Sequence, residues 1–192
     1  MTPGPDRLPM PPADQLTPEQ RRAVEEITAG PRGDIIGPFV PLLRSPELMT
    51  RLQKTGEYLR FHKALPSRLF EMCVLFVARR WNQQFEWSVH YPIALAAGLE
   101  PAIIEAIGLD RRPEGMDGAT AATWDLLDEL HRTKGVSDEV YARALEALGD
   151  RGVVELVAAA GYYTTLAMVM NTARTPAPAE PALPRLSTSE AR

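Results

Sequence analysis

The placement of proline most constrains how this chain can fold. Of its eighteen prolines, five stand within the first twelve residues and four between positions 176 and 184. Proline lacks a backbone donor and breaks helix interiors, so segments this rich in it cannot build a packed core of their own. We therefore expect extended Pro-rich arms over residues 1–16 and 172–192, with a single folded domain over residues 17–171.

Between the arms, helix start and stop signals recur. Thr17 precedes Pro18 and is followed three positions later by Gln20, the pattern of an N-terminal capping box. Glycine closes several segments, as Gly30 and Gly98 do. Apolar residues recur at helical spacing, and no run alternates apolar with polar residues as a half-buried strand does. The sequence predicts an all-α protein of about eight helices, beginning near residues 17, 45, 67, 83, 100, 119, 137 and 150.

Charge and cysteine content narrow the class of protein. The net charge of −4 and the pI near 5.5 give no basis for a nucleic-acid partner or an anionic membrane partner. Cys73 is the single cysteine, which excludes an internal disulfide framework and a Cys-rich metal site. A cytoplasmic protein is expected, because the N-terminal residues lack the apolar run of a signal peptide. The longest apolar stretch, from Val153, contains Glu155 and predicts a buried helix and not a membrane span.

Residues 83–97 carry the clearest candidates for chemistry. On a helix, Glu86 and His90 stand four positions apart and share a face, which Gln83 joins and Trp87 flanks. A histidine and a carboxylate within reach of each other can transfer a proton near neutral pH. The same spacing also occurs in ordinary surface pairs, so the spacing alone leaves a structural role open.

Glu71 is a further candidate because it stands in the apolar helix LFEMCVLFVA. A carboxylate in such surroundings needs a partner or a function. Arg68, Arg79 or His90 could neutralise it, the last if the two helices pack antiparallel. The sequence does not decide whether Glu71 or Glu86 is the closer partner of His90.

Four residues and their spacing resemble the carboxymuconolactone decarboxylase superfamily, which includes alkylhydroperoxidase D. They are Glu71, Gln83 after eleven residues, Glu86 after two more and His90 after three more, with ALAAGL following. The peroxidase branch of that superfamily has cysteines where this chain has Gln83 and Glu86. The segment FEWSVH is similar to the decarboxylase-type branch, and GPFVPLLRSPEL is similar to a segment that many proteins of this superfamily carry before the core. The resemblance covers residues 38–171.

The resemblance implies an all-helical fold in which the helices of Glu71 and His90 line a pocket. It also implies obligate homo-oligomers, commonly trimers or hexamers, with the proline arms wrapped around neighbouring subunits. The implied reaction removes CO2 from a small unsaturated lactone acid without a cofactor. Thiol peroxidase chemistry is excluded, because it needs a low-pKa thiolate and a resolving thiol, and Cys73 lies outside the motif.

In that reaction His90, as imidazolium, is the candidate general acid, and Glu71 or Glu86 would orient it. An anionic substrate needs a cation, for which Arg44 and Arg79 are the candidates. An apolar wall would favour loss of CO2 from a desolvated carboxylate. The remaining residues expected to bind substrate are Phe39, Gln83, Trp87 and Tyr91.

Three other interpretations stay open. An ionised Glu86 in the pocket would oppose an anionic substrate, so the reaction could instead be an isomerisation, a dehydration or a hydrolysis with His90 as base. The chain could also be a non-enzymatic oligomeric binding protein. One histidine and two glutamates could bind iron or zinc, which is a poorer option. No metal or cofactor is therefore expected.

Overall fold

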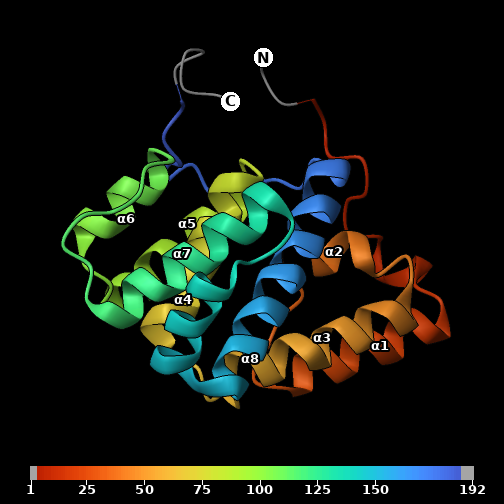
Figure 1. The fold of residues 1–192 in the computed structure, drawn as a ribbon. Helices are drawn as coiled ribbons and strands as arrows, with labels where there is room; N and C mark the ends of the chain where they lie inside the picture. The colour runs from red at the N-terminus through yellow and green to blue at the C-terminus, as the bar shows by residue number, and fades with distance from the viewer. Residues whose placement is uncertain (1–3, 187–192) are drawn as a thin grey trace.

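The computed structural model describes residues 4–186, which are built from helices and connecting loops (Figure 1). No strand occurs between residues 4 and 186, which confirms the predicted all-α class. A short 3-10 helix, η1 (Ala13–Gln15), precedes eight α-helices in this part of the chain. They are α1 (Pro18–Ala29), α2 (Phe39–Leu42), α3 (Pro46–Phe61), α4 (Ser67–Arg80), α5 (Gln84–Ala96), α6 (Pro101–Gly108), α7 (Gly118–Thr133) and α8 (Asp138–Ala173).

Local signals explain where several helices begin. The Thr17 hydroxyl accepts a hydrogen bond from the backbone N–H of Gln20 at 3.2 Å, and the Thr17 N–H donates to the Gln20 side chain at 3.0 Å, so the predicted capping box is present. Ser137 caps α8 by accepting from the backbone N–H of Val140 at 3.4 Å. Helix α4 begins at Ser67, near the predicted start, and has no side-chain cap.

Two elements differ from the expected set. The four-residue helix α2 has no counterpart in the sequence prediction, because so short a segment shows no periodicity. The single helix α8 takes the place of the two helices expected from residues 137 and 150. The predicted break is present as a kink, since Gly149 has φ 69° and ψ 169° inside α8.

Helix α4 is the centre of the bundle. Its residues from Leu69 to Arg79 are all buried, and it packs against α5, α6, α7 and α8. Phe70 of α4 meets Tyr163 of α8 edge to face, with ring centroids 5.8 Å apart. The α1–α3 hairpin lies to one side and reaches α8 through α2 and α3 (Figure 1). Burial on every side explains why the α4 sequence is apolar all round.

Helix α8 is long and apolar enough to cross a membrane by length and composition alone. In the structure, 56% of its most apolar window is buried inside the molecule. It packs lengthwise against α4 and α7. Helix α8 is thus the buried helix that the sequence predicts.

The described parts of both arms lie on the body of the same chain. The Arg7 backbone N–H donates to the Ala173 carbonyl at 2.8 Å, which fastens the N-terminal arm to the end of α8. The Leu183 backbone N–H donates to the Gln84 side chain at 2.9 Å, which fastens the C-terminal arm to α5. The expectation that the arms also wrap neighbouring subunits stays a prediction.

The loop between α1 and α2 closes over α5 and contains two glycines with positive φ. Gly37 has φ 56°, and a Cβ there would lie 2.3 Å from Cε1 of Phe85 on α5. Gly33 has φ 73°, but a Cβ there would meet nothing within 4 Å. The close approach of this loop to α5 therefore depends on Gly37.

Gly37→Ala should lower the free energy of unfolding by about 1–3 kcal/mol, because alanine adds backbone strain at positive φ and a clash with Phe85. Gly33→Ala is the matched control, since it shares the positive φ and lacks the neighbour, and it should cost about 1 kcal/mol. Urea unfolding followed by circular dichroism measures both. Equal losses in the two variants would contradict the packing role of Gly37.

Candidate active site

A buried hydrogen bond joins the two helices that carry the candidate residues. His90 Nδ1 on α5 lies 2.7 Å from Glu71 Oε2 on α4, and each side chain is only 6% exposed. The structure therefore makes Glu71, and not Glu86, the partner of His90. Arg68, which could also have neutralised Glu71, instead pairs with Asp117 at 2.7 Å.

This bond determines which nitrogen of His90 is available. With Nδ1 held by the Glu71 carboxylate, Nε2 is the ring nitrogen left for a ligand. Tyr163 of α8 packs edge to face against the imidazole, with centroids 5.2 Å apart and planes at 87°. Burial raises the pKa of Tyr163 well above its usual range, so its phenol stays neutral. The imidazole thus has one orienting carboxylate and one fixed packing surface.

Glu86 is buried without a partner. Its side chain belongs to a residue that is 3% exposed, and neither carboxylate oxygen has a hydrogen-bond partner among the described residues. Burial raises the pKa of Glu86 well above its usual range, because nothing compensates a negative charge there. The neutral carboxylic acid is favoured, and this form can donate a proton as well as accept a hydrogen bond.

Glu155 on α8 shows what a structural buried carboxylate looks like in this fold. Its oxygens accept four hydrogen bonds. The donors are the backbone N–H groups of Ala64 and Leu65, the Tyr58 hydroxyl and the Arg151 guanidinium. Burial opposes ionisation of Glu155, but the hydrogen bonds outweigh it and lower the pKa. Glu86 has no such bonds, so folding alone does not explain its burial.

Glu86 and His90 line the same small cavity, which has a volume of about 50 Å³. A space of this size holds a few water molecules or a small part of a ligand. The remaining wall is largely apolar, with one tyrosine and two arginines. Its residues are Ile36, Pro38, Phe39, Phe85, Val89, Leu166, Tyr163, Arg32 and Arg60.

Of the predicted substrate-binding residues, Phe39 lines this cavity and Gln83 does not. The Gln83 side chain accepts from the Phe85 backbone N–H at 2.7 Å and so caps the start of α5. Its amide group donates to the Asn171 side chain at 2.8 Å. Gln83 therefore has a structural explanation at the junction of α5 and α8.

Trp87 and Tyr91 lie away from the cavity lining. Their ring centroids are 5.9 Å apart, so the two side chains pack on each other along α5. Trp87 faces α6 closely enough that a Cβ at Gly108 would lie 3.1 Å from its Cη2 atom. The structure thus places Trp87 against the end of α6, with Tyr91 packed beside it on α5.

Neither of the two predicted cations lines the cavity. The Arg79 guanidinium donates to the backbone carbonyl at the end of α6 at 2.9 Å and to a carbonyl of the C-terminal arm at 2.6 Å. The Arg44 guanidinium donates to a backbone carbonyl of α2 at 3.0 Å and to one of the N-terminal arm. The cations at the cavity are Arg32 and Arg60, which no local pattern in the sequence distinguishes.

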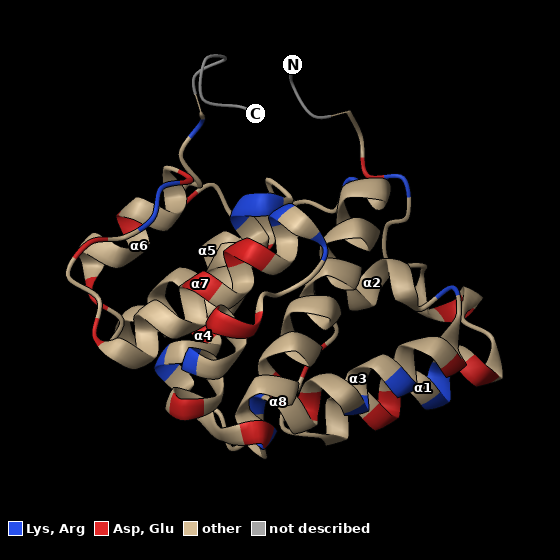
Figure 2. Cartoon of the chain, in the orientation of Figure 1, with Lys and Arg blue, Asp and Glu red and all other residues tan. Residues whose placement is uncertain are grey.

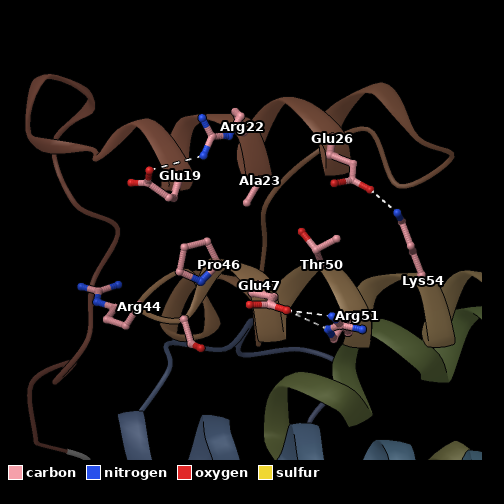
Figure 3. Close-up of a pocket in the computed structure, with 11 residues that line it drawn as sticks. Glu19, Arg22, Ala23, Glu26, Arg44, Pro46, Glu47, Thr50, Arg51 and Lys54 are labelled. Carbon is pink, nitrogen blue, oxygen red and sulfur yellow. Dashed lines mark hydrogen bonds and ion pairs between the residues drawn. The ribbon is translucent and has the colours of Figure 1, made fainter.

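A larger hollow of about 790 Å³ lies between α1 and α3 (Figure 3). Charges of both signs follow one another along these two helices (Figure 2) and pair within the hollow. The pairs are Glu19–Arg22 at 3.3 Å, Glu47–Arg51 at 2.7 Å and Glu26–Lys54 at 2.6 Å. Exposed pairs of this kind are weak and already compensated, so we place the candidate site at the smaller cavity.

Cysteine and metal chemistry find little support in the geometry. Cys73 is buried, and this burial, together with the nearby Glu71, raises the pKa of its thiol far above the usual range. A thiol held in this form is a poor nucleophile. Among residues 4–186, no group of three His, Cys, Asp or Glu side chains is placed to hold a metal ion.

Comparison with known proteins identifies the fold. No family model matches the chain, and no curated protein matches it significantly. Among solved structures, an uncharacterized peroxidase-related protein from Ralstonia eutropha JMP134, described as an alkylhydroperoxidase AhpD core, is similar with a TM-score of 0.73 at 15% identity. That match covers 92% of this chain and 95% of the other.

Two further solved structures are similar. A peroxidase-related protein from Silicibacter sp. TM1040 has a TM-score of 0.69 at 15% identity, covering 94% of this chain and 96% of the other. A protein of unknown function from Agrobacterium tumefaciens, described in relation to the antioxidant defence protein AhpD, has a TM-score of 0.64 at 18% identity, covering 72% and 96%. Identities this low establish the fold alone. The chain has the AhpD-like helical fold, which confirms the predicted fold class.

The unpartnered state of Glu86 predicts how stability depends on pH. The folded protein keeps a proton on Glu86 that the unfolded chain releases above the ordinary pKa of 4.5. Raising the pH above this value therefore favours unfolding, by up to about 1.4 kcal/mol per pH unit, until Glu86 ionises in the folded state. Glu86→Gln removes this effect, so the variant should gain stability relative to wild type as the pH rises above the ordinary pKa of 4.5, as measured by urea unfolding.

Glu155→Gln is the matched control, with the opposite sign. Because the pKa of Glu155 is lowered on folding, its ionised form stabilises the protein above its unfolded pKa, and this stabilisation is lost as the pH falls through the folded pKa. The Glu155→Gln variant should be less stable than wild type at neutral pH by about 1–3 kcal/mol. A constant difference between Glu86→Gln and wild type across the pH range would contradict a neutral Glu86.

Proposed function

We propose that this protein is a cofactor-free lyase that acts by acid–base catalysis on a small cyclic acid, in the manner of carboxymuconolactone decarboxylase. The observation that carries the proposal is the buried His90–Glu71 pair, 2.7 Å apart, beside the unpartnered Glu86 at one cavity. The resemblance of the motif around these three residues to the decarboxylase-type branch supplies the reaction class.

His90 acts as the general acid. Glu71 accepts the hydrogen bond from Nδ1, orients the ring and compensates the charge of the imidazolium, which leaves Nε2–H for the substrate. When the substrate carboxylate leaves as CO2, the electron pair of the broken C–C bond delocalises into the conjugated lactone carbonyl. Nε2 of His90 then donates its proton to the carbon of the conjugated system that is distal to the broken bond. Water afterwards returns a proton to the imidazole ring.

Glu86, as a neutral acid, acts at the lactone carbonyl. Its O–H group can donate a hydrogen bond to the carbonyl oxygen, where negative charge develops. A neutral carboxyl group does not repel the substrate carboxylate, so Glu86 in this form does not oppose the binding of an anionic substrate. Phe39, Phe85 and Leu166 supply an apolar wall that keeps water from the leaving carboxylate.

His90→Gln should lower the turnover of γ-carboxymuconolactone at least about 100-fold, because it removes the proton donor. Glu71→Gln should lower it at least about tenfold, because the ring loses its orienting carboxylate. The loss of substrate absorbance in the ultraviolet, in the presence of a chelator, measures both. His62→Gln, which changes an exposed histidine after α3, is the control and should leave the rate unchanged.

Turnover that survives His90→Gln in a folded variant would contradict the role of His90. If the wild type does not convert this lactone, the reaction is instead an isomerisation, a dehydration or a hydrolysis of a related small molecule, or the protein binds such a molecule without turnover. A screen of cyclic small molecules then separates these alternatives.

Cys73→Ser should leave lactone turnover within about twofold of wild type, because a buried neutral thiol takes no part in proton transfer at the cavity. The same ultraviolet assay measures this. A large loss of activity, in a variant with unchanged circular dichroism, would restore a thiol mechanism.

The proposal includes a homo-oligomer, a trimer or a hexamer, in the cytoplasm. The motif resemblance supports the oligomer, and the single cysteine supports the compartment. Light scattering coupled to size-exclusion chromatography measures the oligomeric state directly.

A further inference from the structure

Two arginines line the candidate cavity without an ion-pair partner. Arg32 comes from the loop between α1 and α2, and Arg60 comes from the last turn of α3. Other half-buried arginines have carboxylate partners, as Arg68 and Arg80 do at 2.7 Å from aspartates. Within residues 4–186, no ion pair forms at either Arg32 or Arg60.

Arg32 is held by weak contacts. Its guanidinium lies over the Phe39 ring, 4.6 Å from the centroid, and its Nη2 atom is 3.5 Å from the Tyr162 hydroxyl. Its Nε atom is buried and has no partner in the described chain. Burial lowers the pKa of Arg32, and the positive charge of Arg60 lowers it further. Since a guanidinium remains charged in proteins, the two cations oppose each other until an anion binds.

The sequence makes room for this arrangement at Gly56, one helical turn before Arg60. A Cβ at Gly56 would lie 2.1 Å from the Tyr162 hydroxyl oxygen and 2.5 Å from Nη2 of Arg32. Glycine weakens a helix interior, so its presence in the middle of α3 has a steric explanation here. Gly56 lets the Arg32 side chain pass between α3 and α8 to the cavity.

We propose that Arg32 and Arg60 together bind the carboxylate of a small monocyclic acid whose ring enters the cavity beside Glu86 and His90. Guanidinium groups bind carboxylates through paired, charge-assisted hydrogen bonds. Glu86, with both oxygens buried and unpartnered, offers a hydrogen bond to a polar atom of the ring. Phe39 and the other apolar wall residues suit a planar, unsaturated ring. The inference deepens the proposed function and rests on it, because the proposed function assigns Glu86 and His90 as the groups that act on the ring.

The charges around the cavity favour an anion. His90 and Glu71 compensate each other across their hydrogen bond, and Glu86 favours its neutral form. Glu57 is the carboxylate that acts on Arg32 from α3, and its side chain accepts from Gln53 at 3.0 Å. The two arginines therefore leave the cavity with an excess of positive charge that a single carboxylate reduces.

Isothermal titration of the full chain with 2-furoate and with 2-furamide tests this, because the two probes share a ring and differ in charge. The wild type should bind furoate at least about tenfold more tightly than furamide. Arg32→Gln and Arg60→Gln should each weaken furoate binding about 10–100-fold and leave furamide binding within about twofold. Arg51→Gln, an exposed arginine on the same helix as Arg60, is the control and should change neither affinity.

Absence of furoate binding, equal affinity for the two probes, or furoate binding unchanged in both arginine variants would overturn the proposal. Should a variant unfold, the wild type alone decides. Its affinity for furoate should fall as sodium chloride is added, while its affinity for furamide stays constant. An affinity for furoate that does not change with salt concentration overturns the proposal.

The outcome is separable from that of the proposed function. Arginine-dependent furoate binding without lactone turnover by wild type rejects the proposed reaction and supports the carboxylate site. Lactone turnover together with arginine-independent furoate binding rejects the carboxylate site and leaves the proposed reaction in place.

Discussion

The bond between His90 and Glu71 connects α4, the central helix of the bundle, to α5. Its partners are 19 residues apart in the chain, so the bond sets how α4 and α5 align. Both groups are buried, and either one left without its partner would be a costly uncompensated group in an apolar interior. The same apolar surroundings also exclude water, which strengthens any electrostatic interaction with a ligand there.

Three buried glutamates show how one fold treats the same side chain in different ways. Glu155 has four hydrogen bonds and holds α3 and the loop between α3 and α4 against α8. Glu71 is committed to His90. Glu86 has no partner among the described residues, although it is as deeply buried as the others. A group that costs stability and gives no structural return is best explained by what it does for a ligand.

The helices and part of the site were predictable because their signals are local. Helix caps depend on residues three or four positions apart. Glu71 stands out because its neighbours in the sequence are apolar, whichever helices later pack around it. The pairing was not predictable, because the spacing allows both Glu71 and Glu86 as partners of His90, and only the packing of α4 on α5 selects Glu71. The sequence also does not identify Arg32 and Arg60 as site residues, since one stands in an irregular loop and the other on a half-exposed helix. Only the approach of that loop to α3 and α5 brings their charges to one cavity.

The C-terminal arm is hydrogen-bonded to α5. The Leu183 N–H bonds to Gln84, and the Ser88 hydroxyl donates to the Pro181 carbonyl at 2.9 Å, while the other side of the same helix carries the cavity residues. The arm therefore contacts one side of α5, and the candidate site residues Glu86 and His90 lie on the other side. A change confined to this arm would therefore act on the cavity through the position of α5, without altering any residue that lines it.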